Sequence, residues 1–165
     1  MSWCRHIATA LLLTGWLAAC GFQPVYQPGS NLDERLSQVH VDSLDGRIGQ
    51  ATRNALLDAI GAPNRPTRPT HRLTMSIATD RERSGIQADE TASRINVIVT
   101  TTWQLRLLDD EQTLVGSGSE TRAVPFNVVD DDYASLIAGR DAERLAGRLS
   151  GEAVRTRLLL LLRRN

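Results

Sequence analysis

The chain has 165 residues and a formal net charge of zero, because 19 basic residues balance 19 acidic ones. Every basic residue is an arginine. Domains that bind nucleic acid are normally strongly basic, so the balanced charge argues against a nucleic-acid partner. Without its first 19 residues the chain of 165 has 146, the size of one ordinary domain.

Residues 1–19 are typical of an export signal peptide rather than of a folded domain. Arg5 and His6 form a short basic start, and an apolar stretch follows from Ile7 to Leu17. About 11 apolar residues are too few to cross a bilayer, which takes about 20. Two alanines then precede Cys20, and a cysteine directly after such a small pair is the lipobox pattern of bacterial lipoproteins.

The lipobox predicts that Cys20 carries lipid. In that chemistry the thiol receives a diacylglyceryl group, the chain is cut before the cysteine, and the new amine is acylated. The alternative is an ordinary signal peptide followed by a chance cysteine. Cys4, the only other cysteine, leaves with the signal, so no disulfide is expected. Several acyl chains, at about 0.8 kcal/mol per buried CH₂, would hold the protein firmly on a membrane.

The residue after the lipidated cysteine gives a sorting hint. In lipoproteins an aspartate there favours retention in the inner membrane, whereas this chain has Gly21. We therefore expect the outer membrane. Residues 20–37 predict a lipid-anchored tether, since Pro24, Pro28 and Gly29 interrupt regular structure. One domain is then expected over residues 38–165.

The first elements of this domain are a strand and a helix. Alternating residues over 38–42 predict a short strand. Apolar residues at helical spacing from Ile48 to Ile60 predict a helix. Gly61 is placed to end it in the left-handed conformation.

Strict alternation over Arg94–Leu108 is the clearest pattern in the chain and predicts a long strand buried on one face. Each fully buried Val, Ile or Leu there would contribute about 1.5–3 kcal/mol. Thr70–Thr79 and Thr113–Val124 predict two further strands, and Pro125 is expected to end the last one.

A second helix is predicted from Tyr133 to Leu162, with a kink or break between Gly147 and Gly151. Asp130–Asp132 precede it, where a helix N-terminus favours negative charge. Calcium binding is the weaker interpretation, because the three aspartates lack the spacing of an EF-hand loop. The predicted buried stripe consists of Leu145, Leu149, Ala153 and Leu160.

The predicted element order is β-α-β-β-β-α. A parallel pair of strands crossed by the first helix, followed by an antiparallel meander, gives a four-stranded mixed sheet. With both helices on one face of that sheet, the fold class is α+β, a two-layer sandwich.

Catalytic patterns are missing from the sequence. His40 and His71 are isolated, no serine lies in a G-x-S-x-G elbow, and no paired metal ligands occur. We therefore expect neither an enzyme nor a bound metal or cofactor.

The segment between the second and third predicted strands, residues 80–94, carries the one concentration of charge that suggests binding. Arg81, Arg83 and Arg94 would present guanidinium groups near the end of a long hairpin, where they could bind phosphate or carboxylate groups. The alternative is a solvated hairpin tip with no ligand.

With these parts assembled, the chain resembles the LptE family of lipopolysaccharide-assembly lipoproteins. The segment Cys20–Tyr26 is similar to the mature N-terminus of that family. The pattern Leu73–Ile77, then a charged hairpin, then Asn96–Thr100 is also similar in type and spacing. The element order matches the family fold, and the likeness covers the whole mature chain.

The resemblance implies a partner role in the outer membrane. LptE proteins plug the large β-barrel LptD, help it to assemble, bind lipopolysaccharide, and act with LptD in its export to the outer leaflet. Basic residues of the hairpin are associated with lipopolysaccharide binding in the family, and Arg81 and Arg83 occupy the matching region. The domain would lie on the periplasmic side or inside the barrel. The alternative is a periplasm-facing lipoprotein with a structural or cell-wall-synthase-activating role.

Overall fold

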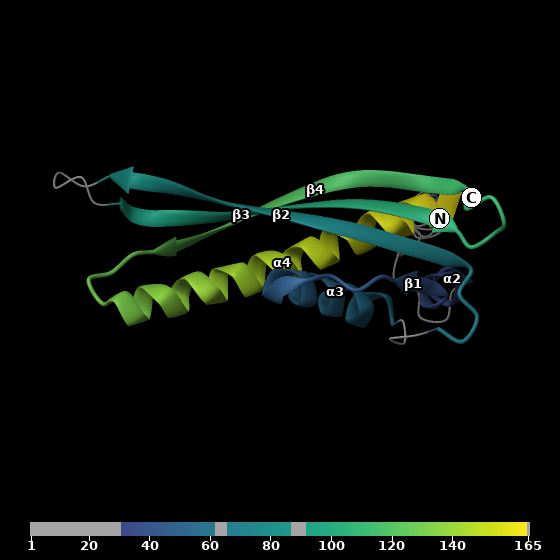
Figure 1. Ribbon diagram of the computed structural model, residues 1–165, viewed down its shortest axis with the longest axis horizontal. Helices are drawn as coiled ribbons and strands as arrows, with labels where there is room; N and C mark the ends of the chain where they lie inside the picture. Colours follow the sequence, from purple (N-terminus) through teal and green to yellow (C-terminus); the bar gives the residue numbers. More distant parts are fainter. Residues whose placement is uncertain (1–30, 62–65, 87–91, 165) are drawn as a thin grey trace, which may run out of the picture.

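The computed structural model describes residues 31–61, 66–86 and 92–164. Cys20 and the predicted signal peptide lie outside these residues, as does the hairpin tip at 87–91. Seven elements follow in chain order (Figure 1). They are α2 (Asn31–Ser37), β1 (Val39–Val41), α3 (Gly46–Ile60), β2 (His71–Ile86), β3 (Ala92–Leu107), β4 (Leu114–Asn127) and α4 (Asp132–Arg164).

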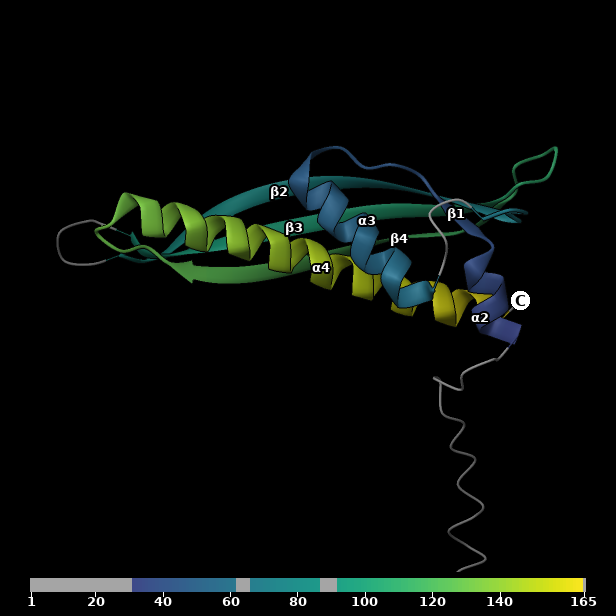
Figure 2. The same cartoon turned by 90° about the horizontal axis from the view of Figure 1, so that it is seen from below.

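The four strands form one mixed sheet in the order β1-β2-β3-β4. β1 pairs with β2 in parallel, and the other neighbours are antiparallel. α3 and α4 lie on the same side of this sheet (Figures 1 and 2). The predicted α+β sandwich is therefore confirmed, with α2 as an additional short helix.

α2 corrects the prediction for residues 31–37, which were expected to belong to the tether. They form a helix because Leu36 is buried in the core. Arg35 also donates a hydrogen bond of 2.8 Å to the carbonyl of Leu162, near the C-terminus of α4. Two tertiary contacts thus order a segment whose local sequence does not demand a helix.

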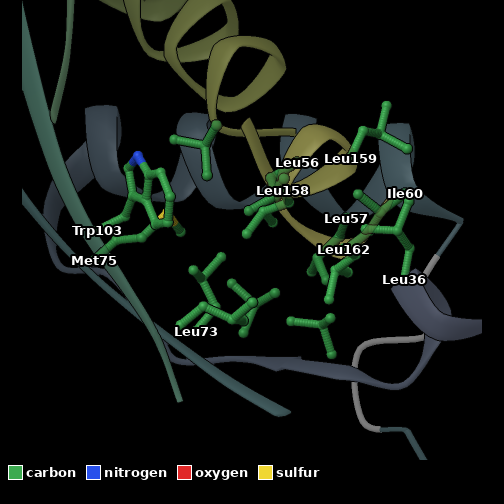
Figure 3. Packing of buried hydrophobic residues seen from close by; sticks show 14 residues of the cluster. Leu36, Leu56, Leu57, Ile60, Leu73, Met75, Trp103, Leu158, Leu159 and Leu162 are labelled. Atoms are coloured by element: carbon green, nitrogen blue, oxygen red, sulfur yellow. The ribbon is translucent and has the colours of Figure 1, made fainter. Parts of the chain in front are cut away.

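The core is largest where α2, α3 and the C-terminal half of α4 meet the sheet. Figure 3 shows Leu73 and Trp103 from the strands facing Leu56 from α3 and Leu158 from α4. β3 shows the predicted alternation, with every second residue from Val97 to Leu105 buried. A smaller cluster lies toward the hairpin and is built from Val97, Val99, Val124, Ala142 and Ala146.

Two features of β3 and β4 concern their connection and end. In the turn, the Thr113 amide donates to the carboxylate of Asp109, and this hydrogen bond lowers the pKa of Asp109.

The prediction that Pro125 ends the last strand is wrong. Pro125 pairs with Asn96 and the strand continues to Asn127. β4 is an edge strand, where a residue without an N–H group can be accommodated.

α4 is one unbroken helix, so a break at Gly147–Gly151, one of the two predicted alternatives, is wrong. The predicted stripe is wrong in part, because Leu145 and Leu160 are exposed, Leu160 by 51%. The buried positions face both the sheet and α3, which obscures a single apolar stripe in the sequence. None of the described helices is both long enough and apolar enough to cross a membrane.

Gly147 and Gly151 lie where α4 touches α3. A Cβ atom on Gly147 would lie 2.9 Å from the carbonyl oxygen of Ile48, and one on Gly151 would lie 2.5 Å from that of Thr52. Real Cβ atoms do not approach backbone oxygens so closely, so these positions admit only glycine at this helix separation. The glycines that suggested a break are instead the contact surface.

We predict that Gly151→Ala lowers the free energy of unfolding by about 1–3 kcal/mol, because the new methyl group forces the two backbones apart. Urea denaturation measures the change. Gly139→Ala is the matched control, since its Cβ would meet only the ring tip of Phe126, at 3.3 Å. Equal stabilities of the two variants would contradict the packing role of Gly151.

Candidate functional site

The three arginines predicted from sequence do not lie on one face of the sheet. Arg81 pairs with Val97 and Arg83 with Ile95, so both arginines lie on the side of the sheet that carries the helices. Arg94 pairs with Ser84 and therefore belongs to the opposite, open face. There its Nε donates to the side-chain oxygen of Asn127 at 3.3 Å. The structure thus brings Arg81 and Arg83 together and separates Arg94 from them.

Arg81 and Arg83 are exposed although they are on the helix-bearing side. The reason is the unequal length of the two helices. α3 has 15 residues and α4 has 33, so α3 begins only about midway along the sheet (Figure 2). The hairpin end of β2 consequently has no helix above it, and Thr79 beside the arginines is exposed as well.

Glu143 of α4 is the buried charged residue at this corner. One of its carboxylate oxygens accepts a hydrogen bond from Arg47 of α3 at 3.0 Å, and the other accepts one from Arg81. A buried carboxylate is costly unless it is paired, and here two guanidinium groups satisfy it. Glu143 therefore connects α3, α4 and β2 at the point where α3 begins.

Sequence reasoning missed Glu143, because one acid in a highly charged helix is not distinctive. Its only sequence signal is its position four residues before Gly147, which lies on the strip that contacts α3. The ion pair also revises the role of Arg81. Part of its guanidinium is engaged within the domain, whereas Arg83 makes no ion pair with any residue that the structure describes.

The two histidines that the sequence singled out lie away from this corner. His71 is buried at the opposite end of the sheet, where burial, and secondarily the charge of Arg35, lowers its pKa. His40 lies 3.4 Å from a carboxylate oxygen of Asp42. Within the described ranges, no group of three potential metal ligands is found.

No family model matches the sequence, and no curated protein matches it. Among solved structures, a protein of Caulobacter crescentus CB15 described as a candidate lipoprotein aligns with a TM-score of 0.66. The two are 23% identical, and the alignment covers 81% of this chain and 96% of the other. The two chains share a fold.

Two further solved structures align less well. The rare lipoprotein B of Shewanella oneidensis has a TM-score of 0.44 and 12% identity, with 75% of this chain and 90% of that chain covered. A minor lipoprotein of Acinetobacter baumannii has a TM-score of 0.49 and 8% identity, with coverages of 74% and 88%. Scores of this size do not establish a common fold.

We predict that Arg81 and Glu143 are energetically coupled. A double-mutant cycle with Arg81→Gln and Glu143→Gln should give a coupling free energy of about 1 kcal/mol, reduced by the exposure of the arginine. The exposed pair Arg144–Asp141, at 3.0 Å, is the control and should give about 0.3 kcal/mol. If the buried pair couples no more strongly than the control, Glu143 does not hold Arg81 in solution.

Proposed function

We propose that this chain is an outer-membrane lipoprotein of the LptE type that binds lipopolysaccharide and partners an LptD-type β-barrel in its export. The observation that carries the proposal is the pair of exposed arginines, Arg81 and Arg83, beyond the N-terminus of α3. Guanidinium groups are suited to phosphate, and the lipid A part of lipopolysaccharide is phosphorylated. The lipobox at Cys20 and the fold shared with a candidate lipoprotein support the same proposal.

The composition of the open face of the sheet supports the proposal that this domain lies inside the lumen of a barrel. Its central rows consist of short, uncharged polar side chains, and no helix that the structure describes covers them (Figure 1). The lumen of a large outer-membrane barrel is polar, so a flat hydroxyl-rich surface can lie against it without burying charge. The residues of these central rows are Thr74, Ser76, Thr100, Thr102, Gln104, Ser117, Ser119 and Thr121.

In this proposal the protein acts by binding and not by catalysis. The corner offers cations and one carboxylate, and Glu143 already accepts hydrogen bonds from two arginines. A carboxylate held in that way is poorly placed to act as a general base, which must accept a proton from a substrate. The role left to this corner is to hold a ligand.

Purification of the protein from detergent-solubilised outer membranes tests the proposal as a whole. We expect the mass of the N-terminal peptide to show an acylated Cys20, and a large β-barrel to co-purify in a nearly equal amount. An unmodified peptide would refute the lipid anchor. An acylated protein that brings down no barrel would refute the LptE-type role and favour a structural or cell-wall-synthase-activating lipoprotein.

We predict that Arg83→Glu weakens lipopolysaccharide binding about tenfold, a loss of about 1.4 kcal/mol that is typical of one charge-assisted contact. Binding to purified lipopolysaccharide is measured by calorimetry or fluorescence. Arg83 is the better choice than Arg81, because reversing Arg81 would also repel Glu143. Arg148→Glu on the exposed side of α4 is the control, and equal binding by the two variants would leave Arg83 a solvated surface residue.

A further inference from the structure

The strip of α4 that contacts α3 continues beyond the N-terminus of α3. Residues three or four apart lie on the same side of a helix. Counting back from Gly147 along this strip gives Arg140, Leu136 and Tyr133. α4 extends beyond the start of α3 at Gly46 (Figure 2), so Tyr133 and Leu136 lie past the end of that contact, and Arg140 borders it.

Two of the three residues are apolar and exposed. Tyr133 is 71% exposed and Leu136 is 50% exposed, and Val129 just before the helix is exposed as well. Single apolar residues at a surface need no explanation, but several together favour a ligand or partner surface. The sheet-facing positions of the same helical turns, such as Gly139 and Ala142, are buried. These turns of α4 therefore bury one face against the sheet, and Tyr133 and Leu136 are exposed on a different face of the helix.

Cations border this apolar strip at the end next to α3. A groove of about 350 Å³ lies between the two helices there. Arg47 enters it from α3, and Arg140 and Arg144 enter it from α4. Its one carboxylate, Glu143, is already bound to Arg47 and Arg81. Arg144 pairs with Asp141 at 3.0 Å. Arg140 makes no ion pair with any residue in the described ranges, so its positive charge in the groove is uncompensated.

The amides of Gln50 and Asn54 also line the groove, and they can donate hydrogen bonds to an anion without adding charge. Arg83 lies on β2, on the same side of the sheet. The N-terminal half of α4 therefore combines an apolar strip with guanidinium groups at its border. A ligand matching both parts must join an anionic group to an apolar one.

We propose that this surface binds the lipid A end of lipopolysaccharide. A phosphate lies in the groove at Arg140 and Arg47, and acyl chains lie along Leu136 and Tyr133. The inference rests on the proposed function and extends it from the hairpin to α4. Charge complementarity selects this occupant. A neutral lipid would leave Arg140 without an anion, and a free phosphate would leave the apolar strip uncovered.

The test compares Arg140→Glu with Arg148→Glu, two charge reversals at exposed positions of the same helix that differ in whether the residue lines the groove. Each full-length protein is titrated with purified lipopolysaccharide and with the same material after enzymatic dephosphorylation. We expect the wild type and Arg148→Glu to prefer the phosphorylated form. Arg140→Glu should bind it at least tenfold more weakly and lose the preference.

A second variant addresses the apolar strip. Leu136→Asn removes apolar contact at an exposed position without changing charge, so it should weaken binding of both forms of lipopolysaccharide several-fold. The preference for the phosphorylated form should remain, because Arg140 and Arg47 are unchanged. Circular dichroism melts of all variants confirm that they are folded.

The outcomes separate this inference from the proposed function. If the wild type binds no lipopolysaccharide, both are refuted. If the wild type binds and Arg140→Glu binds as Arg148→Glu does, the α4 site is refuted while the proposed function stands. If Arg140→Glu keeps lipopolysaccharide binding but loses the co-purifying barrel, the surface is a protein interface and the lipid site is refuted.

Discussion

The close approach of α3 to α4 is the constraint on which the rest of the structure depends. Gly147 and Gly151 let the backbones of the two helices touch, which fixes where along α4 the shorter helix lies. Toward the C-terminus of α4 the two helices together cover the sheet, and large aliphatic side chains fill the space. Toward its N-terminus α4 extends beyond α3, and a smaller core there includes Ala142 and Ala146. The unequal helix layer thus produces one end with a large core and one open end.

Two buried carboxylates tie α4 to the sheet. Glu143 joins α4 to β2 through Arg81, and Glu120 of β4 accepts a hydrogen bond of 2.5 Å from Arg157 of α4. Buried ion pairs add little net stability, because desolvation offsets most of their attraction. Their geometry is nevertheless selective, since a shift of α4 by one turn would break both of these pairs between α4 and the sheet. They therefore help to fix the position of the long helix, and Glu143 does so beside the open corner.

The sequence predicted the elements that are buried on one face only. It failed for α4, which is buried against two neighbours. β3 is buried on one face only, so its alternation was visible, and Gly61 has the left-handed backbone that ends α3. α4 is buried against both the sheet and α3, and no single stripe could reveal this. The contribution of Leu36 to the core depends on residues more than 100 positions away, such as Leu158, which no local pattern contains.

The candidate site was predictable in part for the same reason. A strand period of two places Arg81 and Arg83 on one face whatever the pairing. The side taken by Arg94 depends on the register of the hairpin, which is set by a turn that the sequence does not define. Glu143 and Arg140 could not be assigned at all, because their surroundings depend on where α3 begins against α4. The strand pattern alone therefore identified two arginines that could bind an anion, but not the surface of the domain to which they belong.

The geometry also separates the proposed anchor from the proposed binding surface. α2, the first described element after Cys20, packs at the C-terminal end of α4, whereas the open corner lies at the hairpin end (Figure 1). From Leu162, which accepts the hydrogen bond of Arg35, back to Arg140 the helix spans 22 residues, or about 33 Å. A lipid held at the groove would therefore lie about that far along the domain from α2.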